Sequence, residues 1–161
     1  MRCAYVPSPC VCFQYGSRGA EVFDAFSACF AALPIVHIIE HQVFVTHGGL
    51  YGKSVTLKEL AAIDRFEEVP SSGSLLEEGL WSDPKPGKGR SESPRGAGLL
   101  FGPDVTKEFL TRNAPLNLIV RSHECMTKGY KSHHHDQVIT SGAQHSAAKQ
   151  QEHLTARRPH S

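Results

Sequence analysis

The segment that decides the fold is Gln42-Val43-Phe44-Val45-Thr46-His47-Gly48-Gly49-Leu50. Residues 43–46 have high β-propensity and predict a buried strand. The strand stops at His47, and the C-terminal ends of strands are where α/β proteins keep their functional side chains. The two glycines that follow allow a turn with positive φ and leave space for a close approach. His47 is therefore a candidate functional residue, and the alternative is a hydrogen-bonded histidine before an ordinary turn.

The residues around this strand predict two helices and a hairpin. Residues 21–32 place apolar side chains three and four positions apart, which indicates a helix. The β-branched run 35–39 predicts a second strand, joined to the first by a short turn at residues 40–42. Residues 56–63 begin with a threonine followed three positions later by a glutamate, which is the capping box of a helix.

The second half of the chain repeats the pattern of a strand that leads to a histidine. Residues 103–112 predict a helix that starts at a proline. Residues 118–120 then predict a short buried strand, and His123 follows it closely. Residues 131–140 predict two short strands around His133-His134-His135. We interpret that triplet as a solvated loop rather than a metal-binding module, because no partner ligands lie near it in the sequence.

Two stretches between these elements predict loops. Residues 66–79 carry a proline and a Ser-Ser-Gly sequence, and residues 85–98 are rich in Gly, Pro, Ser, Lys and Arg. A loop as long as the second is usually functional or disordered. Trp81 separates the two loops, and a core side chain beneath the second loop is one of two interpretations that stay open.

Composition narrows the class of protein. The chain has 161 residues, which suits one domain, and a net charge of +1, which implies neither a nucleic acid nor a membrane partner. Five cysteines form an odd set without a framework spacing, so we expect free thiols at Cys3, Cys10 and Cys12, a reducing compartment and a cytoplasmic or also nuclear location. Segments 1–15 and 141–161 show no hydrophobic period and are expected to pack poorly.

The candidate functional residues combine two kinds of chemistry. Neutral imidazoles such as those of His47 and His123 suit Zn, Fe or Mn. Arg95, followed by a glycine, can present a planar fork to a phosphate. Metal ligands together with a phosphate fork indicate phosphoryl chemistry.

Four motifs in this order resemble the metal-dependent serine/threonine protein phosphatases, the phosphoprotein phosphatase family. They are Phe44-Val45-Thr46-His47-Gly48-Gly49-Leu50, Leu80-Trp81-Ser82-Asp83-Pro84, Arg95-Gly96 with Phe101-Gly102-Pro103-Asp104-Val105, and Arg121-Ser122-His123-Glu124 with Gly129-Tyr130. The third motif resembles the type-five branch of this family more than the other branches. The resemblance covers about residues 20–140, which predicts an unmatched segment at 1–19, a partial catalytic domain at 20–140 and a disordered tail at 141–161.

The resemblance implies a fold and a site. The fold class is α/β, an incomplete calcineurin-like metallophosphoesterase β-sandwich flanked by helices. The family holds two divalent metal ions, usually Mn, Fe or Zn, and acts on phosphoproteins, often with a regulatory protein. By resemblance, His47 and His123 are ligands of one metal, and Arg95 is one of two arginines that hold the phosphate. Asp83 resembles a loop aspartate near the catalytic water.

The family motifs Gly-Asp-x-His-Gly, Gly-Asp-x-x-Asp-Arg-Gly and Gly-Asn-His-Glu do not occur in this sequence. They supply the other metal ligands, the second phosphate arginine and the catalytic acid. The chain therefore resembles the C-terminal half of the catalytic domain, with an incomplete metal site. We expect a phosphatase by family that is inactive as this chain, and the alternative is a non-catalytic fragment that acts in protein binding.

Overall fold

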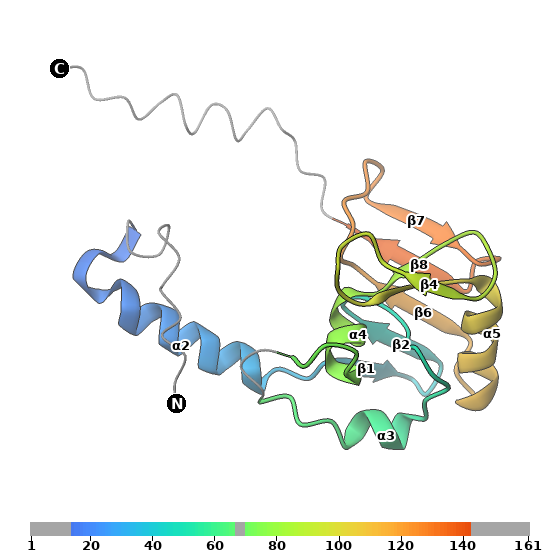
Figure 1. Ribbon diagram of the computed structural model, residues 1–161, viewed down its shortest axis with the longest axis horizontal. Helices are drawn as coiled ribbons and strands as arrows, with labels where there is room; N and C mark the ends of the chain where they lie inside the picture. Colours follow the sequence, from blue (N-terminus) through green and yellow to red (C-terminus); the bar gives the residue numbers. More distant parts are fainter. Residues whose placement is uncertain (1–13, 67–69, 143–161) are drawn as a thin grey trace. The chain divides into compact units, whose positions relative to one another are not determined.

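The computed structural model describes residues 14–66 and 70–142, and these separate into two units (Figure 1). The first unit contains 14–34, 64–66 and Pro70, and the second contains 35–63 and 71–142. The domain boundaries expected from the sequence stay a prediction. The expectations for residues 1–13, including the thiols of Cys3, Cys10 and Cys12, and for residues 143–161 lie outside the described residues.

The first unit is built on one helix. The short 3-10 helix η1 (Gly16–Arg18) leads into α2 (Gly19–Ala32), so the helix predicted at 21–32 is confirmed. The Phe26 and Phe30 rings lie 5.8 Å apart, and these residues are 53% and 63% exposed. The apolar face that predicted the helix is thus largely exposed.

The second unit contains two sheets and three helices. The larger sheet has the strand order β1 (Val36–Ile39), β2 (Val43–Thr46), β6 (Leu118–Arg121), β8 (Val138–Ser141), β7 (Tyr130–His133). The smaller sheet has the order β3 (Asp83–Pro84), β5 (Leu99–Phe101), β4 (Arg90–Glu92). The chain is an α/β fold, as expected.

The larger sheet is parallel at its centre and antiparallel at both edges. Strands β2, β6 and β8 run parallel, whereas β1 pairs antiparallel with β2 and β7 pairs antiparallel with β8. The predicted hairpin, the strand at 118–120 and the two strands within 131–140 are therefore confirmed. Phe44 pairs with Ile119 in the parallel register, so β2 and β6 end side by side.

Helices α3 (Leu57–Ala61) and α5 (Pro103–Arg112) confirm two sequence predictions. Thr56 forms the expected capping box, because its hydroxyl accepts from the Glu59 amide and its amide donates to the Glu59 carboxylate at 2.8 Å. Proline occupies the first turn of α5.

The prediction that residues 66–79 and 85–98 form loops is partly wrong. Helix α4 (Leu75–Trp81) forms within the first loop and beyond it, because Ser74 caps it by accepting from the Glu77 amide and because it buries Leu76 and Gly79. The second loop contains β4, whose residues pair with β5 from Arg90↔Phe101 to Glu92↔Leu99. Strand pairing orders a segment whose composition alone indicated a loop.

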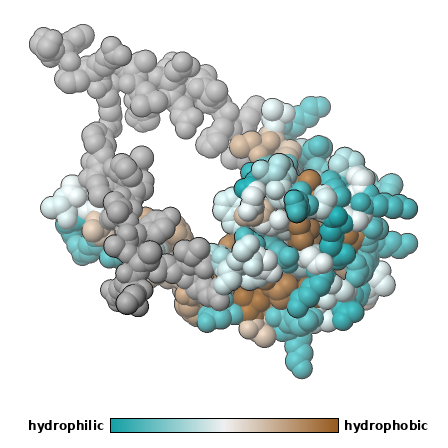
Figure 2. All heavy atoms as spheres, in the orientation of Figure 1, coloured by the Kyte–Doolittle hydropathy of each residue, from teal (hydrophilic) through white to brown (hydrophobic). Residues whose placement is uncertain are grey.

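The hydrophobic core joins both sheets to the helices. Phe44 from β2 packs edge-on against Phe109 from α5, with ring centroids 4.8 Å apart. The buried cluster contains Phe44, Leu50, Tyr51, Val55, Leu60, Phe101, Val105, Phe109, Leu110, Leu116, Ile119 and Val138. Figure 2 shows mainly hydrophilic side chains on the visible face of this unit, with small hydrophobic areas between them. No helix of the described part is both long and apolar enough to cross a membrane.

His134 corrects the interpretation of the histidine triplet as a solvated loop. Its residue is 9% exposed, and its Nδ1 lies 2.8 Å from the Thr106 hydroxyl of α5. Its Nε2 lies 2.9 Å from the Lys85 carbonyl oxygen. Since a carbonyl only accepts, Nε2 carries the proton and Nδ1 accepts from the threonine. The β7–β8 turn is thereby fastened to α5 and to the segment after β3.

Replacing His134 with Ala should lower the free energy of unfolding by about 1–3 kcal/mol, because the fully buried Thr106 hydroxyl loses its partner. Urea unfolding measures this loss. The control is His135→Ala, because His135 is exposed and shares the positive φ of His134. Equal effects of the two substitutions would contradict the assigned role of His134.

Stability should also depend on pH through His134. Burial lowers its pKa, against opposing contributions from the Lys85 carbonyl and Asp104. The folded state then binds its proton less readily than the unfolded chain, so stability is full above a pH of about 6.5 and falls as the pH drops further. Urea midpoints between pH 7.5 and 5.5 should fall more steeply for the native chain than for His134→Gln. Urea midpoints that fall equally with pH in the two proteins would contradict the role assigned to His134.

Candidate functional site

The parallel register of β2 and β6 brings the two predicted ligands together. His47 directly follows β2, and His123 follows two residues after β6. Their ring centroids lie 5.1 Å apart, and the Ser122 amide donates to the His47 carbonyl at 3.1 Å. The prediction that His47 and His123 lie close together at strand ends is confirmed.

Two glycines after His47 are required for close packing. A Cβ on Gly48 would lie 2.4 Å from the Leu80 carbonyl carbon, and one on Gly49 would lie 2.8 Å from the Ser82 carbonyl oxygen. Neither glycine belongs to the positive-φ set, so the positive φ expected here is wrong. The glycines serve the close approach of the backbone at the end of α4 and just after it, rather than a left-handed turn.

Arg121 joins the segments that carry the candidate residues. Its side chain is fully buried, and it lies at the end of β6. Its Nε donates to the Gly48 carbonyl, and its Nη2 donates to the Asp83 carboxylate at 2.6 Å. Its Nη1 donates to the Glu124 carboxylate. One guanidinium thus connects the turns after β2 and β6 to the start of β3.

The Asp83 carboxylate accepts hydrogen bonds from two arginines. Arg121 donates to Oδ1, and Arg95 Nε donates to Oδ2 at 2.7 Å. Burial raises the pKa of Asp83, but the hydrogen bonds and charges of both arginines outweigh burial and lower it overall. Asp83 is therefore a carboxylate at neutral pH, and it fixes the direction of the Arg95 side chain.

His123 is held in an unusual state. Its backbone is left-handed (φ 71°), a conformation that costs a non-glycine residue about 1–2 kcal/mol. Its Nδ1 is buried without a hydrogen-bond partner among the described residues, although Asp83 Oδ1 lies 3.4 Å away. Burial lowers the pKa of His123 against the opposing charge of Asp83, so we treat the pair as a contact with a neutral imidazole rather than an ion pair.

The two imidazoles fit part of a metal site. His47 Nδ1 lies 3.2 Å from the Ser122 hydroxyl, which leaves Nε2 for a ligand, and the orphaned His123 nitrogen is suited to coordination. Across residues 14–66 and 70–142, no three His, Cys, Asp or Glu side chains gather in a metal-binding arrangement. The described residues thus offer two ligands for one divalent ion and do not fit a pair of ions.

The structure brings the four sequence candidates together, and their roles stay predictions. His47, His123, Asp83 and Arg95 lie in one cluster. Trp81 is 42% exposed, with its ring edge-on to His123 at 5.4 Å, so the core interpretation is wrong. Arg121 was missed, although the two-residue period of a strand places it on the same face as buried Ile119.

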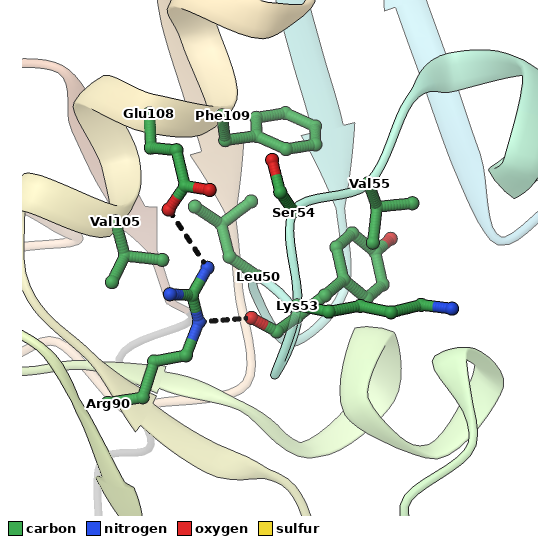
Figure 3. A pocket seen from close by; sticks show the side chains of 9 residues that line it. Leu50, Lys53, Ser54, Val55, Arg90, Val105, Glu108 and Phe109 are labelled. Carbon is green, nitrogen blue, oxygen red and sulfur yellow. Dashed lines mark hydrogen bonds and ion pairs between the residues drawn. The ribbon is translucent and has the colours of Figure 1, made fainter.

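A separate hollow between α5 and the segment after His47 shares no residue with this cluster (Figure 3). It is lined by Leu50, Tyr51, Lys53, Ser54, Val55, Arg90, Val105, Glu108 and Phe109. Arg90 donates to the Tyr51 carbonyl at 2.8 Å and pairs with Glu108 at 3.2 Å. The dashed contacts of Figure 3 lie across the hollow, so Arg90 has a structural role there.

Comparison with known proteins agrees with the geometry. The calcineurin-like phosphoesterase family matches residues 12–126. The chain is 49% identical over 126 residues to serine/threonine-protein phosphatase 5 of Solanum lycopersicum, covering 77% of this chain and 22% of that protein. It is 50% identical over 136 residues to serine/threonine-protein phosphatase T of Trypanosoma brucei brucei, covering 79% and 28%.

A solved structure supports the same assignment. It is a protein serine/threonine phosphatase from Saccharomyces cerevisiae with similarity to human phosphatase PP5, with a TM-score of 0.72 and 34% identity. The match covers 82% of this chain and 40% of that one. The chain spans only 22% to 28% of the length of the two curated relatives above.

Replacing Arg121 with Met should lower the free energy of unfolding by about 3–5 kcal/mol, because it removes a buried cation from between two carboxylates. Arg90→Met is the matched control and should cost about 1 kcal/mol, because the Arg90–Glu108 pair is partly exposed. Urea unfolding compares them. If the two variants are equally stable, Arg121 does not organise the site.

Proposed function

The chain belongs to the calcineurin-like phosphoesterase family, and from this membership we propose that it forms part of the catalytic centre of a metal-dependent serine/threonine protein phosphatase. The substrates are phosphoserine and phosphothreonine in proteins, and the reaction is hydrolysis of the phosphoric monoester. The observation that supports this most is the convergence of His47, His123, Asp83 and Arg95 at the ends of two parallel strands.

Arg95 is the group that binds the phosphoryl oxygens. Its Nε is engaged by Asp83, and its side chain is 38% exposed. Among the described residues its two Nη groups make no hydrogen bond, so they are available to a ligand. Two parallel N–H donors in a fixed plane match two phosphate oxygens.

His47 and His123 are the ligands of one divalent cation, for which Mn, Fe and Zn are the candidates. When bound, such an ion polarises a phosphoryl oxygen and lowers the pKa of coordinated water. Ser122 orients the His47 ring through Nδ1. Asp83 keeps Arg95 directed and holds negative charge beside His123.

The 161-residue chain should not hydrolyse phosphoproteins on its own. Its sequence lacks the motifs that supply the bridging carboxylate, the second phosphate arginine and the proton donor. Loss of a proton donor or of one fixed electrostatic contact commonly costs about a hundredfold or more in rate. The second candidate function is non-catalytic protein binding, including binding to a regulatory protein, which the exposed Phe26 and Phe30 of α2 favour.

We place this activity in the cytoplasm or nucleus. Cys29 and Cys125 are free and exposed thiols, which suits a reducing compartment. Fractionation of cells that produce the chain tests this location.

Purified chain supplied with Mn should hydrolyse phosphopeptides no faster than its His47→Ala variant, because the described residues hold too few ligands for a pair of ions. Release of inorganic phosphate measures the rate. A rate of the native chain clearly above that of His47→Ala, and lost equally in Arg95→Ala, would show that the chain is a complete enzyme.

The metal-binding half of the proposal has its own test. Titration with Co²⁺ should give visible absorption bands from imidazole coordination in the native chain, and His47→Ala and His123→Ala should each abolish them. His37→Ala is the matched control, because His37 is exposed on the edge strand β1. Bands that survive both substitutions would place the cation elsewhere.

A further inference from the structure

Ser93 lies in a turn that presents its hydroxyl beside Arg95. The Gly96 amide donates to the Ser93 carbonyl at 3.2 Å, which closes the turn, and the Arg95 amide donates to the Ser93 hydroxyl at 3.2 Å. Ser93 directly follows β4, an edge strand of the smaller sheet whose residues are all exposed. Ser93 itself is partly buried, whereas Ser91, Glu92, Pro94 and Arg95 are exposed, so an enzyme reaches the hydroxyl from an exposed turn.

The residue after Ser93 is Pro94. Proline biases the preceding residue towards extended conformations. Protein kinases bind the residue that they phosphorylate in an extended segment, so the turn closed by the Gly96 amide must open for the transfer. Proline-directed kinases select serine in this dipeptide. The sequence contains one other Ser-Pro pair, Ser8-Pro9, which lies outside the described residues.

Arg95 is the cation that an added phosphate would meet first. The segment 85–95 is basic in sequence, with Lys85, Lys88, Arg90 and Arg95 against Glu92, although Arg90 is held by Tyr51 and Glu108. A phosphoryl group on Ser93 would keep its backbone donor at Arg95 and would lie two residues from that partly exposed side chain, whose Nη groups make no hydrogen bond among the described residues.

We propose that Ser93 is a phosphorylation site for a proline-directed protein kinase, and that its phosphoryl group binds Arg95 and withdraws it from substrate. The inference rests on the proposed role of Arg95 in binding substrate phosphate. The phosphorylated turn then acts as an internal competitor for the site.

The transfer is balanced with ATP as the donor. The Ser93 oxygen forms a bond to the γ-phosphorus, the bond from that phosphorus to the β,γ-bridging oxygen breaks, and ADP leaves. The hydroxyl proton passes to a base of the kinase. Ser93 gains a charge of about −1.5 to −2 at pH 7.

The phosphoryl group can compete with Asp83 for Arg95 because Asp83 is also paired with Arg121. If Arg95 turns to the phosphate, Arg121 still donates to Asp83 at 2.6 Å, so no buried carboxylate is left unpaired. The dianion also offers three strong acceptor oxygens against the one carboxylate oxygen that Arg95 now uses.

The test uses the full chain with Ser8→Ala to remove the other Ser-Pro pair. The chain is treated with a proline-directed kinase and ATP, the site is mapped by mass spectrometry, and the phosphoserine is titrated by phosphorus NMR. Its pKa should lie about half a unit below that of the same protein in urea, because a nearby cation favours the dianion. Arg95→Gln should remove most of this shift.

The matched control is Ser91, which lies two residues earlier and is not followed by proline. Ser91→Ala should still accept phosphate, and Ser93→Ala should not. Absence of phosphate at Ser93, or an equal phosphoserine pKa in the native and Arg95→Gln chains, overturns the inference. The titration needs neither metal nor turnover, so such a failure leaves the proposed phosphatase role to be judged by its own tests.

Discussion

The buried guanidinium of Arg121 is the interaction on which the rest of the site depends. A buried guanidinium requires acceptors in every direction in which it donates. The structure supplies carbonyls from Gly48 and Ser82 and carboxylates from Asp83 and Glu124. These acceptors belong to three segments that are distant in sequence. The desolvation cost of one cation is therefore offset only when all three segments are in place.

This requirement explains which parts of the fold could be predicted from sequence. The strand at 43–46 and the helix at 103–112 follow from residues that are near neighbours in the chain, namely a β-branched run and a proline at a helix start. Helix α4 was missed because its sequence is short and its stability comes partly from burying Leu76 and Gly79. Local propensity carries little information about an element that is stabilised by tertiary packing.

The candidate site shows the same division between local and tertiary information. His47 and His123 could be found because His47 directly follows a predicted strand and His123 lies within a few residues of another. The burial of Arg121 could have been inferred from strand alternation, but its partners could not, because they lie up to 73 residues away in the chain. His134 was misread for a similar reason, since its partners Thr106 and Lys85 belong to other elements.

The arrangement also explains how a partly exposed arginine acquires a defined direction. Asp83 is buried and shared, with one oxygen on Arg121 and the other on Arg95. The first arginine fixes the carboxylate, and the carboxylate then fixes the second arginine, whose side chain is 38% exposed. A long exposed side chain would otherwise lose considerable conformational entropy on binding a phosphate. Because the ordering is done during folding by a fully buried group, less of that cost remains for the binding step.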